Sequence, residues 1–589
     1  MSKNVTVQLG TYDVAVMGAG IAGVVAAVSA AEAGARVALL SADHTFSGSS
    51  FFPGTWGLGL VGARDKADVD DFVETICGVG RGMADPTLAR ALVEGVPAGI
   101  EWLEAHGVAL REAGAAGQRE YIPCFDHARR SWHGLERASF AAAMDRTLDE
   151  AGVDRFGRCK VLDLRLGTGQ NAPDTVGSKN RPCPPDANGA DITFYAQQAE
   201  QVGMVRSGAV VLATGGYGGL YDRTLTMPDV LGDAHALALA CGAELVNMEF
   251  IQIMPGLVAP VGNVVFNEKT FRYAHLGCED AGCPAGSPKD AADLDTLMPT
   301  RAEHGPFTAS REDRAVDLAI AAAGECGVPV RYDLPAELPE FMRVYSDWFE
   351  REFGRNPKEG VRIAPYAHAA NGGILVDKRA RTGVPGLFAC GECTGGMHGA
   401  DRIGGLASAN ALVFGLAAGQ EAALWAEEHP VETAGDATPA RTEFRASRRA
   451  DEALAQLRHT MGEHCLVVRT AEGLESAQAA IAQLKALIED SLEPLDADAE
   501  HAGAEHADAR GSESGQPDEQ RRPLTARDHA QTVRALHALT TAEAAVAAMS
   551  ARTESRGAHF REDAPAEDPG QARPLRVRLE NGHAVAQPA

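Results

Sequence analysis

A short glycine-rich segment near the N-terminus constrains the fold of this chain more than any other feature. Residues 12–17 form an apolar run after a polar start, which is typical of a buried parallel strand. Residues 21–33 are rich in alanine and valine, as in a helix packed on a sheet, and residues 37–40 form a second apolar strand. A strand, a helix and a strand within about 30 residues predict a Rossmann-like α/β domain.

The glycines of the turn have separate roles in this interpretation. Gly18 allows the tight turn, Gly20 lets the backbone approach a pyrophosphate, and Gly23 lets the helix pack closely on the strand. Unpaired N–H groups at the helix start attract phosphate. The predicted dinucleotide contacts are therefore Gly18, Ala19, Gly20, Ile21, Ala22 and Gly23.

The end of the second strand departs from a standard NAD site. A carboxylate is expected there to bind the ribose, but the residue is Ser41. Either Ser41 takes this contact or Asp43 reaches it from the following loop. The departure argues against a nicotinamide dehydrogenase.

Composition excludes several classes of function. The 589 residues suffice for two or three domains, and the formal net charge of -27 disfavours nucleic acid and anionic membranes as partners. No apolar run reaches the roughly 20 residues needed to span a bilayer, and the N-terminus lacks the pattern of an export signal. We therefore expect a cytoplasmic protein without a membrane span. An anionic substrate would need local arginines to hold it.

The cysteines predict neither a disulfide framework nor a metal site. There are 11 of them, scattered along the chain. Cys278 and Cys283 come closest to a metal-binding pair, but no second pair with zinc spacing follows. Cys390 and Cys393 lie inside a second glycine-rich stretch. We expect mostly reduced, structural thiols.

That second glycine-rich stretch spans residues 387–405, and residues 213–215 form a strand end with a glycine turn between the two stretches. Further landmarks are residues 232–236, 247–252, 398–404 and 552–559. Together they resemble the succinate dehydrogenase/fumarate reductase flavoprotein family, which includes L-aspartate oxidases. The resemblance covers most of the chain and implies FAD as the cofactor.

The resemblance implies an α/β fold of three parts: a Rossmann-like FAD-binding domain, an inserted α+β capping domain and a C-terminal helical domain. The FAD-binding domain would comprise residues 1–249 and 356–430, with residues 250–355 as the capping domain between its two parts. The helical domain would span residues 440–568, with a disordered insertion at 493–523. Residues 569–589 would form a loosely attached tail.

The resemblance also assigns the cofactor site. Some members of the family hold FAD covalently through a histidine in the loop after Ser41. Ser49 stands about where that histidine would be, so we predict non-covalent FAD, with His44 as the nearest alternative ligand. The remaining implied cofactor residues are Ser41, Ser49, Ser50, Val161, Ala213, Thr214, Gly215, Asp233, Glu392, Ala407 and Ser408.

Three residues are the candidates for catalysis. Arg402 lies where the family places a substrate arginine, and a guanidinium matches a carboxylate bidentately. His368 matches the carboxylate-binding histidine of the family. Arg311 matches its proton-shuttling arginine, with Arg314 one helical turn away as an alternative. Alternative interpretations are an ion pair of Arg402 with Asp401, a structural role for His368 and a charged helix start at Arg311.

Part of the family's dicarboxylate pocket is replaced. The family usually continues with a histidine and a threonine after the Glu-Phe-x-Gln run, but this chain has Met254 and Gly256. A Thr-Glu pair further on is replaced by Asn267 and Glu268. Losing hydrogen-bond partners would weaken dicarboxylate binding. A larger or less charged substrate would fit Met254.

We therefore predict an FAD-dependent oxidoreductase that transfers hydride between flavin N5 and a carboxylate-bearing small molecule, such as fumarate, succinate or an L-aspartate-like compound. A second hypothesis is a flavoprotein subunit that passes electrons to an iron–sulfur or quinone partner and acts on a non-dicarboxylate substrate. A third is an FAD-containing binding or electron-carrier protein without turnover.

Overall fold

The computed structural model describes residues 6–55, 57–112, 122–167, 189–277, 294–431, 444–495 and 522–589. Its central sheet has the order β6-β2-β1-β9-β8-β7, and β17 also pairs with β9. β1, β2, β6, β9 and β17 run parallel where they pair, whereas β8 is antiparallel to β7 and β9. The strands are β1 (Val7–Met17), β2 (Val37–Leu40), β6 (Asp154–Phe156), β7 (Cys159–Leu166), β8 (Ala190–Ala196), β9 (Gln201–Leu212) and β17 (Leu387–Ala389).

The predicted strand, turn and helix at the N-terminus are confirmed. The last four residues of β1 are buried, and α1 (Ile21–Glu32) follows it and packs against α10 (Leu406–Glu428). Gly18 has a φ of 112°, and a Cβ on Gly23 would lie 1.8 Å from the Gly18 carbonyl oxygen. Only glycines permit this close approach of helix and turn.

A second sheet is antiparallel and has the order β12-β11-β15-β14-β13. Its apolar residues form a separate core with α7, α8 and α9. The expected capping segment, residues 250–355, supplies most of it, and β15 joins from beyond that boundary. The elements are β11 (Ile251–Ala259), β12 (Val264–Val265), β13 (Ala274–Leu276), β14 (Val328–Tyr332), β15 (Val361–Ala370), α7 (Met298–Arg301), α8 (Arg314–Ala322) and α9 (Glu340–Phe353).

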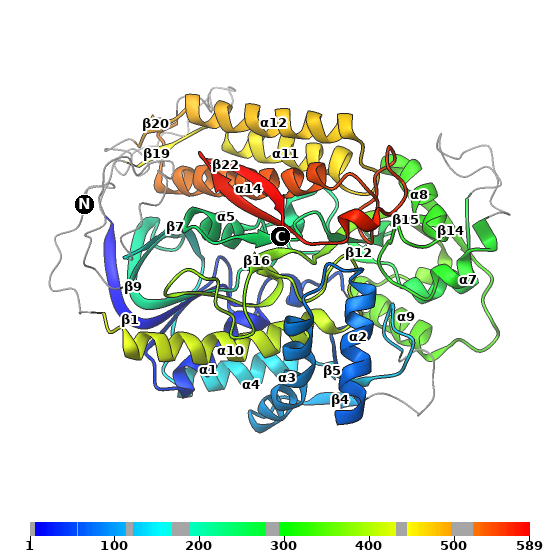
Figure 1. Ribbon diagram of the computed structural model, residues 1–589, viewed down its shortest axis with the longest axis horizontal. Coiled ribbons are helices and arrows are strands. Elements are labelled where there is room, and N and C mark those ends of the chain that lie inside the picture. Colours follow the sequence, from blue (N-terminus) through cyan, green and yellow to red (C-terminus); the bar gives the residue numbers. More distant parts are fainter. Residues whose placement is uncertain are drawn as a thin grey trace, which may run out of the picture.

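The C-terminal helices pack on one another, as α12 contacts both α11 and α14. Figure 1 shows them along one side of the molecule, with α1 and α10 on the opposite side. They are α11 (Ala450–Cys465), α12 (Ala471–Asp490) and α14 (Ala526–Ala551). The insertion expected at 493–523 lies mostly outside the described residues, but Glu493–Pro494 forms the short strand β20, which pairs with β19 (Arg445–Ala446).

The C-terminal residues differ from the expected loose tail. β21 (Leu575–Glu580) and β22 (His583–Pro588) form a hairpin, and β21 adds to the strand β10 (Leu245–Val246). The sheet is completed by β16 (Gly373–Leu375) and β18 (Thr394–Gly395). Alternating burial along β21 explains the attachment, since Leu575 and Val577 enter the core.

The remaining elements lie near the N-terminal part of the chain or connect those above. The strands are β3 (Gly59–Gly62), β4 (Leu110–Glu112) and β5 (Ser131–Leu135). The α-helices are α2 (Val69–Val79), α3 (Pro86–Ala105), α4 (Arg137–Glu150) and α5 (Asp233–Ala240). The 3-10 helices are η1 (Ser49–Phe51), η2 (Lys66–Asp68), η4 (Gly218–Leu220), η5 (Glu268–Tyr273), η6 (Gly324–Cys326), η7 (Pro357–Glu359), η8 (Gly391–Cys393) and η10 (Pro569–Gln571).

Helices long and apolar enough to cross a membrane do not occur in the described ranges. Within the same ranges, no group of three or more His, Cys, Asp or Glu side chains could hold a metal ion. Cys278 and Cys283 lie outside the described residues.

Candidate active site

A cavity of about 370 Å³ extends from the turn after β1 to the capping sheet. Every implied cofactor residue except Gly23 lines it, and Gly23 packs under the turn at Gly18. His368 and Arg402 also line the cavity, but Arg311 does not. The structure thus brings together residues from both glycine-rich stretches, which are separated by more than half of the sequence.

The cavity fits a dinucleotide at the N-terminus of α1. A Cβ on Gly20 would come no closer than 3.5 Å to its nearest neighbour, the Ser47 carbonyl oxygen, so the backbone there is open to the cavity. The Ser49 hydroxyl is buried without a hydrogen-bond partner. Free helix N–H groups and an unpaired hydroxyl are suitable partners for phosphate oxygens. Ser41 donates to the His44 carbonyl oxygen at 2.9 Å, while Asp43 also lines the cavity, so both ribose candidates remain in place.

The second glycine-rich stretch closes the middle of the cavity. α10 begins at Leu406 and presents Ala407 and Ser408 to the cavity from its first turn. Glu392 accepts a hydrogen bond from the Ala370 N–H at 3.0 Å. Burial raises the pKa of Glu392. These groups form a polar rim around the centre of the cavity.

The C-terminal helical domain also reaches the cavity, which sequence reasoning missed. Arg534 of α14 lines it and donates to Asp233 at 3.0 Å and to the Asp229 carbonyl oxygen at 2.6 Å. Burial opposes ionisation of Asp233, but Arg534 and a hydrogen bond from His537 outweigh it and lower the pKa of this carboxyl. Arg534 sits in a helical stretch without a motif, so the sequence carried no signal for it.

Arg402 is the central cation of the opposite end. It is 8% exposed, donates to the Gln252 side-chain oxygen at 2.5 Å, and has a buried Nε without a partner. Among the described residues, no carboxylate lies within ion-pair distance of it, so the alternative ion pair with Asp401 does not form; Asp401 instead accepts from Thr308. Burial lowers the pKa of Arg402 to about 10, which still leaves it cationic at neutral pH.

His368 reaches the same end of the cavity through an irregularity in β15. Gln252 pairs with Ala369 and Ile253 with Ala367, so His368 is the extra residue of a bulge. Bulges redirect side chains and are frequent beside active sites. Burial and the charge of Arg402 lower the pKa of His368 to about 3, and its Nδ1 has no partner. The imidazole is therefore neutral and available to a ligand.

Arg311 lies outside this arrangement. Its guanidinium forms ion pairs with Glu303 at 3.3 Å and Asp313 at 3.4 Å, and it is 37% exposed. Asp313 precedes α8 and also binds His304. Arg314 donates to the Ala309 carbonyl oxygen and does not line the cavity either. The contacts of Arg311 therefore match the alternative interpretation, in which it belongs to a charged segment at a helix start.

Further residues that line the cavity were noted only in part from the sequence. Met254, Cys124, Glu268, Gly305 and Pro306 line it. The Cys124 thiol donates to Glu268 at 3.5 Å, and burial followed by the Glu268 charge raises the pKa of this thiol to about 12. Cys124 is therefore neutral. It carried no sequence signal because it belongs to no motif.

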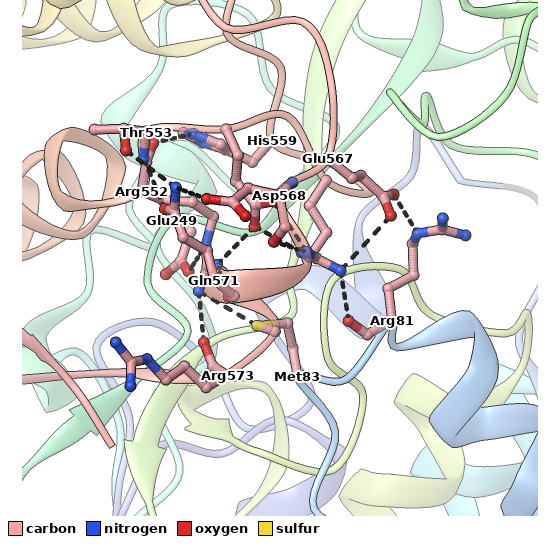
Figure 2. Close-up of polar contacts among 12 residues, drawn as sticks. Arg81, Met83, Glu249, Arg552, Thr553, His559, Glu567, Asp568, Gln571 and Arg573 are labelled. Atoms are coloured by element: carbon pink, nitrogen blue, oxygen red, sulfur yellow. Dashed lines mark hydrogen bonds and ion pairs between the residues drawn. The ribbon is translucent and has the colours of Figure 1, made fainter.

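A buried network of ion pairs holds the segment before β11 in place (Figure 2). Arg552 donates to Glu249 at 2.6 Å and to Glu554 at 3.0 Å, and it also binds the carbonyl oxygens of Gln571 and Arg573. Arg556 binds both oxygens of Glu554. Glu249 is three residues before Gln252, so the network supports the strand that orients Arg402.

Two family models match the chain. The model described as "FAD binding domain" matches residues 13–272 and 320–408, and the model described as "Fumarate reductase flavoprotein C-term" matches residues 517–574. The first covers more than half of the chain. It also includes the residues that line the cavity, except Gly305, Pro306, Ala411 and Arg534.

Similar proteins agree with these matches. The chain is 30% identical to an L-aspartate oxidase of Streptomyces coelicolor over 98% of this chain and 92% of that protein. It is 27% identical to a fumarate reductase flavoprotein subunit of Proteus vulgaris over 80% of each. The solved Sdh1 complex of Mycobacterium smegmatis in the apo form contains a chain with the same fold, at a TM-score of 0.72 and 22% identity, covering 99% of this chain and 94% of that one. The chain therefore belongs to the FAD-binding flavoprotein family that includes L-aspartate oxidases and fumarate reductase flavoprotein subunits, and it is an FAD-dependent oxidoreductase.

Proposed function

We propose that the chain transfers hydride between FAD and a small molecule that carries a carboxylate, with fumarate, succinate and L-aspartate-like compounds as the first candidates. The observation that supports this most is the buried Arg402 guanidinium, which faces the cavity without a carboxylate partner in the described part of the chain. A buried charge is costly unless it is paired. A substrate carboxylate would supply the missing partner.

Gln252, Arg402 and His368 have separate roles in this proposal. Gln252 orients Arg402 through a hydrogen bond to its Nη2, so that the free edge of the guanidinium is directed to the substrate. Neutral His368 donates a hydrogen bond from its ring N–H to the same carboxylate. When bound, FAD supplies a two-electron acceptor or donor at its N5 atom. The burial of the Arg402 side chain strengthens these polar contacts, because a charge interacts more strongly away from bulk water.

We also propose that FAD is held without a covalent bond. Ser49, at the position implied for the linking histidine, offers only a hydroxyl, and His44 has a largely exposed side chain that lies beside Asp43. Acid precipitation of the purified protein should release all the flavin into the supernatant. Flavin that stays with the precipitate would contradict this proposal and point to His44.

The test of the function is anaerobic single turnover. The oxidised protein is mixed with L-aspartate, succinate and other carboxylates, and the dithionite-reduced protein is mixed with fumarate, while the flavin absorbance is followed. We expect at least one carboxylate to bleach or restore the flavin, and Arg402→Gln to abolish the reaction while retaining FAD. The matched control is Arg379→Gln, an arginine on the surface that pairs with Glu421. A reaction unaffected by Arg402→Gln would contradict the proposed clamp.

A second candidate function follows from the match at residues 517–574. It adds that electrons pass between this flavoprotein and a separate iron–sulfur or quinone partner, since that model describes the C-terminal part of fumarate reductase flavoproteins. Purification from the native cells at low salt, followed by iron analysis, tests this. A preparation free of iron whose reduced flavin is reoxidised rapidly by oxygen alone would contradict it.

A further inference from the structure

The residues that line the substrate end of the cavity fall into two groups of unlike chemistry, which we name the first and the second wall. Arg402, His368 and Gln252 form one wall, and all three are polar. Met254, Cys124, Pro306 and Gly305 line the other, together with the single charged residue Glu268. The walls therefore offer strong binding to one carboxylate and none to a second.

Met254 forms the apolar part of the second wall. It is 8% exposed and belongs to a core cluster with Phe52, Leu225 and Tyr366, of which Leu225 also lines the cavity. A Cβ on Gly305 would lie 3.2 Å from Met254 Cε, 3.6 Å from Cys124 Sγ and 3.7 Å from Glu268 Cδ. These three side chains thus meet at one point, where a methyl, a neutral thiol and a carboxylate face a ligand.

The second wall also lacks a cation among the described cavity-lining residues. Lys160 and Arg534, the other basic residues that line the cavity, lie near one another and near Asp233 at the opposite end. Arg301 of the capping domain is buried but paired with Asp317, and Arg311 is directed toward Glu303 and Asp313. The charges of Arg402 and Lys269 both act on Cys124, but Lys269 does not line the cavity, and Arg402 is already assigned to the first carboxylate. A second carboxylate at this wall would therefore be desolvated against Met254 and lie next to Glu268.

We propose, on the basis of the function proposed above, that the substrate carries a single carboxylate, bound by Arg402, and that its other end is uncharged and apolar and packs against Met254. Apolar burial then replaces the second charge contact as the source of affinity. Met254 and Glu268 determine this specificity, whereas Arg402 provides the binding that both kinds of carboxylate need.

The test compares ligands that differ only by a methyl in place of one carboxylate. The pairs are crotonate and fumarate, butyrate and succinate, and L-2-aminobutyrate and L-aspartate, each titrated into the oxidised FAD-loaded protein with the change in flavin absorbance as the readout. We expect the methyl compound of each pair to bind at least about tenfold more tightly. Met254→His should reduce or invert that ratio, and Met254→Leu, which keeps the apolar wall, should preserve it.

The outcomes separate this inference from the proposed function. If dicarboxylates bind more tightly than their methyl counterparts and Arg402→Gln abolishes their binding, the single-carboxylate inference is overturned and the carboxylate function stands. If neither member of any pair perturbs the flavin, or if Arg402→Gln changes nothing, both fail. Because the comparison of ligands uses the unmodified protein, the result does not depend on a variant that folds poorly.

Discussion

Individual residues set the chemistry of the cavity more than the fold does. Arg402 and His368 are close in space because β15 has a bulge, while Arg311 is turned away because Glu303 and Asp313 hold it. The sequence indicated which segments would line the cofactor end of the cavity, because the backbone turns there require glycine. It could not predict the direction of Arg311, because that depends on ion-pair partners elsewhere in the capping domain.

Gly23 and Gly78 give a matched test of the glycine argument, since both lie in helices. A Cβ on Gly23 would clash with the Gly18 carbonyl oxygen at 1.8 Å, whereas a Cβ on Gly78 of α2 meets nothing within 4 Å. We expect Gly23→Ala to lower the free energy of unfolding by about 2 kcal/mol or more and to weaken FAD retention. Gly78→Ala should raise it by about 0.5 to 1 kcal/mol, because alanine favours the helix. Thermal unfolding and flavin content of both variants check this, and equal shifts would refute it.

At the scale of elements, helices and strands that follow from a local sequence pattern are the easiest to predict. Pairings between segments that are distant in the sequence are the hardest. The β1, α1 and β2 segments follow directly from apolar runs and glycines. The β21–β22 hairpin could not be foreseen, since β10, its partner, is a two-residue strand more than 300 residues earlier.

The Arg552 network is the clearest element-scale prediction. Arg552 is 1% exposed and its removal would leave Glu249 buried, charged and unpaired, with its Oε2 already lacking a partner. We expect Arg552→Met to lower the free energy of unfolding by about 3 to 5 kcal/mol, and Glu249→Gln added to it to recover part of the loss. Arg578→Met, which removes an exposed pair with Glu580, should change it by less than about 0.5 kcal/mol. Thermal unfolding of the four proteins tests this; no recovery in the double variant would argue against an uncompensated charge as the cause.

At the scale of the whole molecule, the C-terminal helices and the cavity form one unit. The loop between β9 and α5 lines the cavity with Leu225, Met227, Asp229 and Val230. Arg458 of α11 binds the carbonyl oxygens of Gly219 and Pro228 in this loop, and Thr541 of α14 binds that of Gly232. The helical domain therefore fixes a cavity wall, and its docking and cofactor binding should stabilise one another.

Arg534 tests this coupling because it belongs to α14 and also lines the cavity. Arg534→Leu removes the ion pair to Asp233 and the hydrogen bond to Asp229, and charged hydrogen bonds of this kind contribute about 1.5 to 3 kcal/mol each. We expect FAD to be released at least about tenfold more readily, measured as flavin fluorescence after dilution. We also expect faster proteolysis of the helical domain in the flavin-free protein. Arg527→Leu, an exposed arginine two turns earlier on the same helix, is the control and should behave like the unmodified protein. Unchanged FAD release in Arg534→Leu would show that the helical domain covers the cavity without contributing to cofactor binding.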